Sequence, residues 1–277
     1  ISTATNSKAF GLNDVLFLYN HEFMHYWLGQ VVKQIPPYND YKWFHEGFTD
    51  YFAHVIMRDK ELFNEQEFKQ RINAVFSAYY SDSSHQWPNG SVQTDGSPSY
   101  EIQQLPYKRG LLFALYLDES IKKQTAGRAS LKTIMQAIFT EARKSGRAFS
   151  NDWLLTLLQQ TTGHDYRPVL DEFITQGRFI SLAHWQKVTD KIVMAPAETF
   201  DLGFTTESGK FALNAVIATI REGANVQKAG LKVGDKIAGG SFKRDPSQQG
   251  TLVVKRGDEK IELTFYPSRQ ISTPQLK

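Results

Sequence analysis

Two stretches of the chain decide its fold. They read His21-Glu22-Phe23-Met24-His25 and, after a turn-rich interval, Trp43-Phe44-His45-Glu46-Gly47-Phe48-Thr49-Asp50-Tyr51. In a helix, His21 and His25 lie four residues apart and therefore share one face. Two neutral imidazoles at this spacing can bind one Zn²⁺ at about 2.0–2.1 Å. Glu22 lies one step round the helix, where a carboxylate can reach a metal-bound water without being a ligand.

A third ligand is expected from the second stretch. The interval between His25 and Glu46 fits a helix, a turn and an antiparallel helix, which would bring Glu46 to the two histidines. Two histidines and one glutamate leave the fourth position of a tetrahedral zinc open, as in catalytic zinc sites. The alternative is a pair of stacked core histidines and two surface glutamates. The aromatic neighbours of Glu46 disfavour it, because a glutamate seldom sits among such groups without a partner.

The bulk composition describes an ordinary globular protein. The chain has 277 residues, 41% hydrophobic and 22% charged, with a net charge of +3, and is long enough for two domains. Scattered Lys and Arg predict no nucleic-acid partner. The absence of Cys excludes disulfides and thiolate zinc sites. The longest apolar run, 111–117, is too short for an integral membrane segment.

The start of the chain suggests a fragment of a longer protein. It opens at Ile1, without Met, only about twenty residues before the His21 motif, and shows no signal peptide. The compartment therefore stays open between bacterial cytoplasm and periplasm.

The chain changes character near residue 190. Helices are expected before this point at 14–28 (capped by Asn13 and stopped by Gly29), 41–57, 61–80, from Pro106 through 117, 130–144, 151–160 and 169–175. Strands are expected after it at 192–193, 211–220, 251–255 and 261–266. The sequence thus predicts a helical domain over 1–190 and a small β-rich domain over 196–270.

These motifs resemble the gluzincin zinc metallopeptidases, in particular the aminopeptidase N and glycyl aminopeptidase families. The segment Tyr107-Lys108-Arg109-Gly110-Leu111 resembles a family segment whose Tyr stabilises the tetrahedral intermediate. Leu117-Asp118-x-x-Ile121 and Thr125-x-Gly127-Arg128-x-Ser130-Leu131 are similar to the glycyl aminopeptidases specifically. The resemblance implies a mainly α, thermolysin-like (gluzincin) catalytic domain, of which 1–190 is the C-terminal portion. It also implies that an N-terminal β domain is missing.

The resemblance assigns roles to the site residues. It implies one Zn²⁺ per chain, held by His21, His25 and Glu46, and peptide substrates cleaved by a metal-activated water. Glu22 would be the general base and Tyr107 would donate a hydrogen bond to the developing oxyanion. Tyr107 is alternatively an aromatic group that packs at the helix start.

Asp50 lies four residues after Glu46, on the same helix face. One interpretation is that it accepts the free ring N–H of a ligand histidine, the usual support of such a ligand. The other, weighed equally, is a solvated helix carboxylate.

The C-terminal β-rich part resembles a PDZ domain. Asp201-Leu202-Gly203-Phe204 is similar to the carboxylate-binding loop, so residues 201–204 are expected to present free backbone N–H groups, with Leu202, Gly203 and Phe204 as candidate peptide-binding residues. The run Ala229-Gly230-Leu231-Lys232-Val233-Gly234-Asp235-Lys236-Ile237 is typical of bacterial PDZ sequences. The stretch 239–250 is expected to form a loop, or at most one helical turn, where a PDZ domain has its second helix, which leaves the groove's function open.

Two functions compete at this point. One is a zinc-dependent peptidase, either an aminopeptidase or an oligopeptidase. The other is a peptide-binding or assembly module in which a catalytically inactive zinc-peptidase scaffold persists. The sequence does not fix the preferred residue or the oligomeric state.

Overall fold

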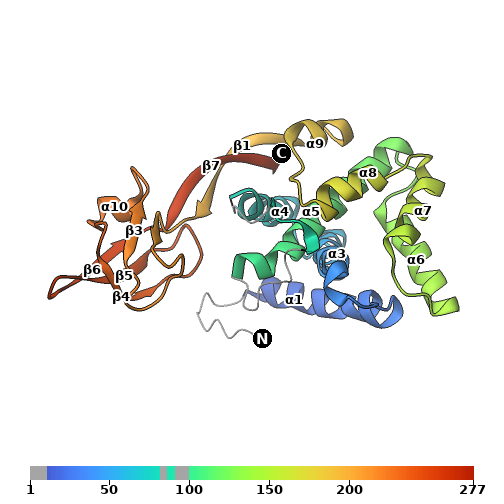
Figure 1. Ribbon diagram of the computed structural model, residues 1–277. Helices are drawn as coiled ribbons and strands as arrows, with labels where there is room; N and C mark the ends of the chain where they lie inside the picture. The colour runs from blue at the N-terminus through green and yellow to red at the C-terminus, as the bar shows by residue number, and fades with distance from the viewer. Residues whose placement is uncertain (1–10, 82–85, 91–99) are drawn as a thin grey trace. The chain divides into compact units, whose positions relative to one another are not determined.

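The computed structural model describes residues 11–81, 86–90 and 100–277. Contacts divide these residues into two units, one formed by 11–195 with Pro274–Lys277 and the other by Pro196–Thr273. The first unit is almost entirely helical (Figure 1). Its helices are α1 (Leu12–His25), α2 (Lys42–His45), α3 (Gly47–Asp59), α4 (Glu65–Ser81), α5 (Tyr100–Gln124), α6 (Leu131–Ser145), α7 (Asn151–Thr162), α8 (Arg167–Leu170) and α9 (Leu182–Val188).

Helix α5 is the centre of the helical unit. It contacts α2, α3, α4, α6, α7 and α9, and its residues from Leu111 to Leu117 are all buried. Aromatic rings fill the space around it, with Trp43 in edge contact with Phe113 and Phe149. The apolar run that is too short for a membrane is therefore the core of a helical bundle.

Helix α1 begins and ends earlier than the sequence predicts. It starts at Leu12, where the N–H of Gly11 donates to the Asp14 carboxylate at 3.2 Å, so Asn13 is not its cap. It ends at His25 and continues as a π-helical turn, η1 (Tyr26–Val31). Within that turn Leu28 and Gly29 leave helical geometry, with ψ of 53° and −52° and an extended φ of 176° at Gly29. The chain thus changes direction directly after the second histidine.

The expected helix over 41–57 is divided at Glu46. A 3₁₀ turn, η2 (Tyr38–Tyr41), leads into α2, and α3 follows after the single residue Glu46. Helix α4 begins at Glu65 rather than at 61, because Asn64 Oδ1 caps it by accepting from Glu67 N at 2.8 Å. The segment predicted at 169–175 forms α8 and a π turn, η5 (Asp171–Thr175).

Pro106 does not open a helix, as the sequence predicted, but lies inside α5. A proline in a helix removes one N–H donor and costs about 3 kcal/mol in a helix interior. Pro106 and its neighbour Leu105 are both buried, and the helix continues through a buried apolar run. This burial offsets the loss of one hydrogen bond.

Two glycines allow α5 to approach the α2–α3 junction closely. A Cβ on Gly110 would lie 1.9 Å from the carbonyl oxygen of Trp43, and a Cβ on Gly47 would lie 2.3 Å from the Cα of Gly110. The two backbones can lie this close only because neither residue has a side chain. Gly47 follows Glu46 and Gly110 is one helical turn after Tyr107, so this approach brings Glu46 and Tyr107 together.

Replacing Gly110 by alanine is therefore expected to destabilise the protein by about 3 kcal/mol, because backbone, rather than a flexible side chain, blocks the new methyl group. Urea denaturation followed by circular dichroism measures the change. Gly90→Ala is the matched control, since a Cβ at Gly90 meets nothing within 4 Å. Equal stability of the two variants would contradict the close approach of the helices.

The second unit is a small β structure with its own core. Its strands are β1 (Ile192–Phe200), β2 (Phe204–Thr206), β3 (Ile217–Ile220), β4 (Lys236–Ser241), β5 (Gly250–Arg256), β6 (Glu259–Phe265) and β7 (Ser268–Leu276), with one short helix, α10 (Asn225–Lys228). They pair as β1–β7, β2–β3 and β4–β5–β6. The two hairpin pairings of β5 are antiparallel, and Ile237, Leu252, Val254 and Leu263 lie in the core.

The observed strands differ from those expected from sequence patterning. Residues 211–216 do not form the first part of a strand as expected, and β2, β4 and β7 were not predicted. The glycines in β4 and the proline in β7 are unfavourable in strands, so sequence patterning does not indicate a strand there. No helix forms between β4 and β5, in agreement with the expectation, although both strands extend into the stretch 239–250.

The expectation of free backbone N–H groups at 201–204 is wrong for two of the residues. The N–H of Asp201 donates to the carbonyl of Pro267 at 2.9 Å. The N–H of Gly203 donates to the Asp201 carboxylate at 2.7 Å. The carboxylate of Asp201 thus accepts a hydrogen bond from an N–H group that was expected to be free for a ligand.

The last residues of the chain return to the helical unit. Asn73 on α4 makes two hydrogen bonds with the backbone of Leu276, at 2.7 and 3.0 Å. Gln275 donates to the hydroxyl of Ser77 at 3.2 Å. Both ends of the Pro196–Thr273 segment are therefore connected to the helical unit, through β1 and through β7.

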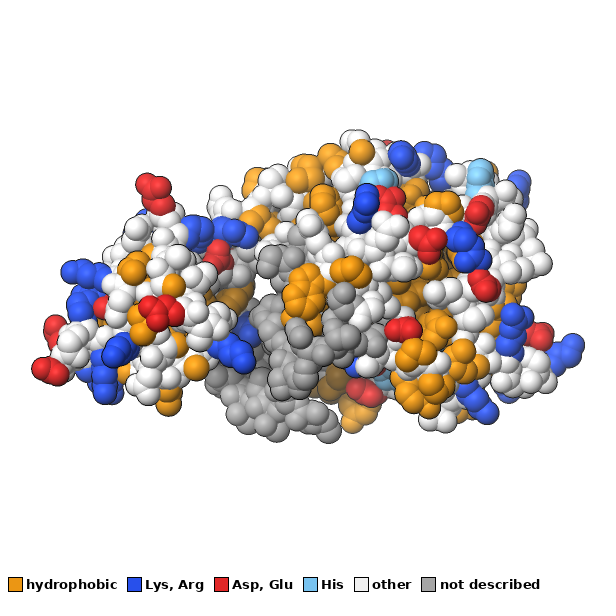
Figure 2. All heavy atoms as spheres, viewed as in Figure 1, with side chains coloured by type: hydrophobic (Ala, Val, Ile, Leu, Met, Phe, Trp, Pro, Cys, Tyr) orange, Lys and Arg blue, Asp and Glu red, His pale blue; other side chains and the backbone are white. Residues whose placement is uncertain are grey.

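Along the described ranges, every helix is too short or too polar to cross a membrane. On the face drawn in Figure 2, Lys and Arg side chains are interspersed with Asp and Glu. This mixture accords with the small net charge of +3.

Candidate metal centre

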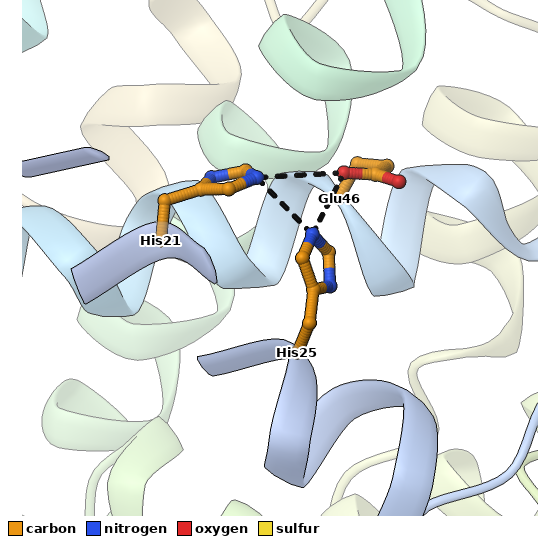
Figure 3. Close-up of side chains that lie close together, drawn as sticks. All are labelled: His21, His25 and Glu46. Carbon is orange, nitrogen blue, oxygen red and sulfur yellow. Dashed lines mark hydrogen bonds and ion pairs between the residues drawn. The ribbon is translucent and has the colours of Figure 1, made fainter. Parts of the chain in front are cut away.

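Three side chains from two parts of the helical unit converge on one point (Figure 3). His21 and His25 project from the last turns of α1, and Glu46 projects from the junction of α2 and α3. The Nε2 atoms of the histidines lie 3.1 Å apart. Oε2 of Glu46 lies 3.7 Å from Nε2 of His21 and 3.4 Å from Nε2 of His25.

These separations suit a common metal ligand sphere. Ligand atoms at 2.0–2.2 Å from a tetrahedral zinc are about 3.3–3.6 Å apart. The three atoms lie within 4.8 Å of one another, and the group was the one metal-ligating cluster found in the described part of the chain. Two imidazole nitrogens and one carboxylate oxygen form a donor set typical of Zn²⁺. The residues present therefore fit the metal that the sequence predicts.

Asp50 supports His21 from the opposite side of its ring. The Nδ1 atom of His21 lies 2.8 Å from Oδ1 of Asp50, which is one turn after Glu46 on α3. A carboxylate at this position accepts the Nδ1 proton and leaves Nε2 free to bind a metal. Of the two interpretations of Asp50, this geometry favours support of a ligand.

The charges at the site are mutually stabilising. Burial alone would raise the pKa of Glu46, but the hydrogen bond to His25 and the charges of both histidines lower it. The same hydrogen bond to Glu46 raises the pKa of His25, against the opposing effect of burial. The ionised Glu46 carboxylate can attract a cation, and a metal that binds there would displace the proton that the raised pKa of His25 favours.

Tyr107 lies beside the three candidate ligands. Its ring is stacked with that of His21 at 6.3 Å between centroids, and its side chain hydrogen-bonds to Glu46. Burial raises the pKa of the Tyr107 hydroxyl, and the charge of Glu46 raises it further. The hydroxyl therefore stays protonated and remains a hydrogen-bond donor at neutral pH. The packing interpretation alone does not account for its place next to Glu46.

Glu22 is exposed, unlike its neighbour His21. Its negative charge is among the smaller contributions that raise the pKa of His25, after the hydrogen bond to Glu46. It also contributes to the raised pKa of Tyr107, after burial and the effects of Glu46 and Asp50. Glu22 thus adds a solvent-accessible carboxylate close enough to His25 and Tyr107 for its charge to act on both.

Two further histidines have structural roles. His45 is fully buried, and its Nδ1 lies 3.0 Å from the carbonyl oxygen of Leu28, which ties α2 to η1. Burial lowers the pKa of His45 to about 4. His54 is also buried, with Nδ1 at 2.8 Å from the carbonyl oxygen of Asp50. Neither joins the candidate ligands.

Sequence reasoning missed the residues that position the site. The Leu28 carbonyl holds His45, the residue before Glu46, and Phe149 stacks on Phe44 at 3.6 Å between ring centroids. Gly47 and Gly110 stood in the quoted motifs, but their contact was not predicted. A glycine at each of two helix positions next to a site residue was the available signal, because glycine in a helix requires a packing reason.

This arrangement defines a candidate metal centre with three protein ligands and a supporting carboxylate. Comparison with known proteins places it in context. Residues 14–96 match the family model described as M61 glycyl aminopeptidase. No curated protein matches the chain.

The fold is similar to a solved structure described as an aminopeptidase N family protein from Idiomarina loihiensis, with a TM-score of 0.62 and 18% sequence identity. The match covers 98% of this chain and 55% of the other, so the chain spans about half of that protein. The similarity establishes a shared fold of helices with a small sheet content. The match of residues 14–96 to the family model supports a peptidase, and the solved structure shows the fold alone.

Proposed function

We propose that the protein is a zinc-dependent peptidase that acts as an aminopeptidase or oligopeptidase. The observation that carries this proposal is the convergence of His21, His25 and Glu46, with ligand atoms 3.1–3.7 Å apart. The match of residues 14–96 to the glycyl aminopeptidase model supports the reaction class. In the thermolysin-like arrangement, these three side chains would hold one Zn²⁺ per chain.

Each residue of the site has a defined part in the proposed reaction. When bound, zinc would act as a Lewis acid that polarises the scissile carbonyl and lowers the pKa of water. The Glu22 carboxylate takes a proton from the attacking water and passes it to the leaving amine. The protonated Tyr107 hydroxyl donates a hydrogen bond to the developing oxyanion of the peptide. Asp50 keeps the His21 ring in the tautomer and orientation that ligation needs.

The proposal is tested by loading the chelator-treated chain with Zn²⁺. We expect about one zinc per chain by atomic spectroscopy, a rise in the melting temperature and the appearance of hydrolysis on a panel of short peptides. His21→Ala and Glu46→Ala should each abolish the stoichiometric binding. Failure to retain zinc under saturating conditions would remove the proposal.

Replacing Asp50 by asparagine is expected to weaken zinc binding about 10–100-fold, because the Nδ1 proton of His21 loses a charged acceptor. Competition with a chromophoric chelator measures the affinity. Asp59→Asn is the control, since Asp59 lies on the same helix and pairs with Arg58. Equal zinc affinities of the two variants would favour the other interpretation, in which Asp50 is a solvated helix carboxylate.

We infer that the β-rich region predicted at 196–270 is a PDZ-like domain without a working carboxylate-binding loop. The supporting observation is that the N–H groups of Asp201 and Gly203 already donate within the chain. Among the candidates Leu202, Gly203 and Phe204, Gly203 therefore has no free N–H group for a peptide C-terminus. This disfavours the alternative function, a peptide-binding or assembly module.

A further inference from the structure

A surface pocket of about 570 Å³ adjoins the candidate metal centre on the side where α1 ends. His25 and Glu46 form one part of its lining. The other part comes from the segment after α1 and includes Gln30, Lys33 and Tyr38. A peptide bound with its scissile carbonyl at the metal centre would extend a neighbouring group into this pocket.

The change of direction at the end of α1 creates the pocket. Because Leu28 and Gly29 leave helical geometry, the following residues line the same depression as Glu46 instead of continuing along the helix axis. The segment is held in place, since the carbonyl of Lys33 accepts a hydrogen bond from the N–H of Phe149 at 3.0 Å. The pocket lining is therefore anchored to the core of the helical unit.

The chemistry of the lining is polar and carries one lysine. The side chain of Lys33 is exposed and forms no ion pair with the described residues. The carboxylate of Glu46, the acidic group of the lining, is engaged with His25. Gln30, Gln34 and Tyr38 add neutral side chains that can donate hydrogen bonds. Such a set recognises an anion with several acceptor atoms.

We propose that this pocket selects peptides that present a carboxylate next to the scissile bond, with Lys33 as the specificity-determining residue. The inference rests on the proposed peptidase function. The carboxylate can come from an acidic side chain or from the C-terminus of a short peptide. Both sources provide a planar carboxylate a few bonds from the scissile bond. The experiment below distinguishes the two sources.

The test compares peptide pairs that differ by a single carboxylate, using the zinc-loaded full chain. Ala-Glu-NH₂ against Ala-Gln-NH₂, and Glu-Ala-NH₂ against Gln-Ala-NH₂, report on a side chain. Ala-Ala against Ala-Ala-NH₂ reports on a free C-terminus. In at least one pair, kcat/KM should favour the charged member about fivefold, the effect of an exposed ion pair. The preference should diminish as salt is added.

Lys33→Gln should remove this preference and Lys33→Glu should reverse it, with the change mainly in KM. Lys132→Gln, an exposed lysine on α6, is the control and should keep both the rate and the preference of the wild type. Equal ratios in the wild type and Lys33→Gln, with hydrolysis intact, would overturn this inference alone. Absence of hydrolysis of every peptide by the zinc-loaded wild type would overturn the proposed function and the inference with it.

Discussion

Glu22→Gln is expected to lower kcat about 10²–10⁴-fold, the usual contribution of a general base. Glutamine keeps the size of the side chain but cannot take a proton from water. Because Glu22 is exposed and lies outside the candidate ligand group, zinc content and stability should match those of the wild type. Steady-state hydrolysis of a peptide panel, together with metal analysis of the same samples, measures both properties.

The control for this variant is Glu141→Gln on α6, which removes an exposed carboxylate far along the sequence. It should leave hydrolysis unchanged. If Glu22→Gln retains full activity with a full complement of zinc, Glu22 is not the base. If the wild type and Glu141→Gln also fail to hydrolyse peptides, the alternative of a catalytically inactive scaffold gains support.

Tyr107→Phe should lower kcat about 10²–10³-fold with a smaller effect on KM, because a hydrogen bond to an oxyanion forms mainly in the transition state. The ring contact with His21 is preserved in phenylalanine, so the site should stay assembled. Single-turnover and steady-state kinetics on the same peptide separate the two parameters.

Tyr19→Phe provides the comparison, since Tyr19 is 71% exposed on α1 and its hydroxyl has no expected role. A loss confined to KM would make Tyr107 a substrate-binding residue. No loss at all would support the interpretation of Tyr107 as a packing aromatic.

The residues of the candidate site could be predicted from their spacing, because a helix places residues four positions apart on one face. His21 and His25 lie four positions apart, as do Glu46 and Asp50, and one helical turn gives each pair a common face. The metal role of these residues stays a prediction until zinc is measured. The peptidase class rests on motifs that the family model supports, whereas the structural neighbour supports the fold.

Other features were beyond sequence reasoning for physical reasons. Periodicity alone cannot show that the chain changes direction at Leu28, after α1, or that a helix is divided at Glu46, because tertiary contacts decide where helices end. Pro106 is tolerated inside α5 through burial that only the fold reveals. The strands β2 and β4 carry too few apolar residues to be recognised one at a time.

The connection of the β-rich unit to the helical unit at both of its ends changes how the chain can be dissected. A stop codon after Ala195 would remove Gln275 and Leu276 along with that unit, and α4 would lose the hydrogen bonds that Asn73 and Ser77 make with them. In topology, Pro196–Thr273 is an insertion between two segments of the helical unit rather than a tail. To isolate the helical unit, Pro196–Thr273 should be deleted and Ala195 joined to Pro274 through a short linker, instead of truncating the chain.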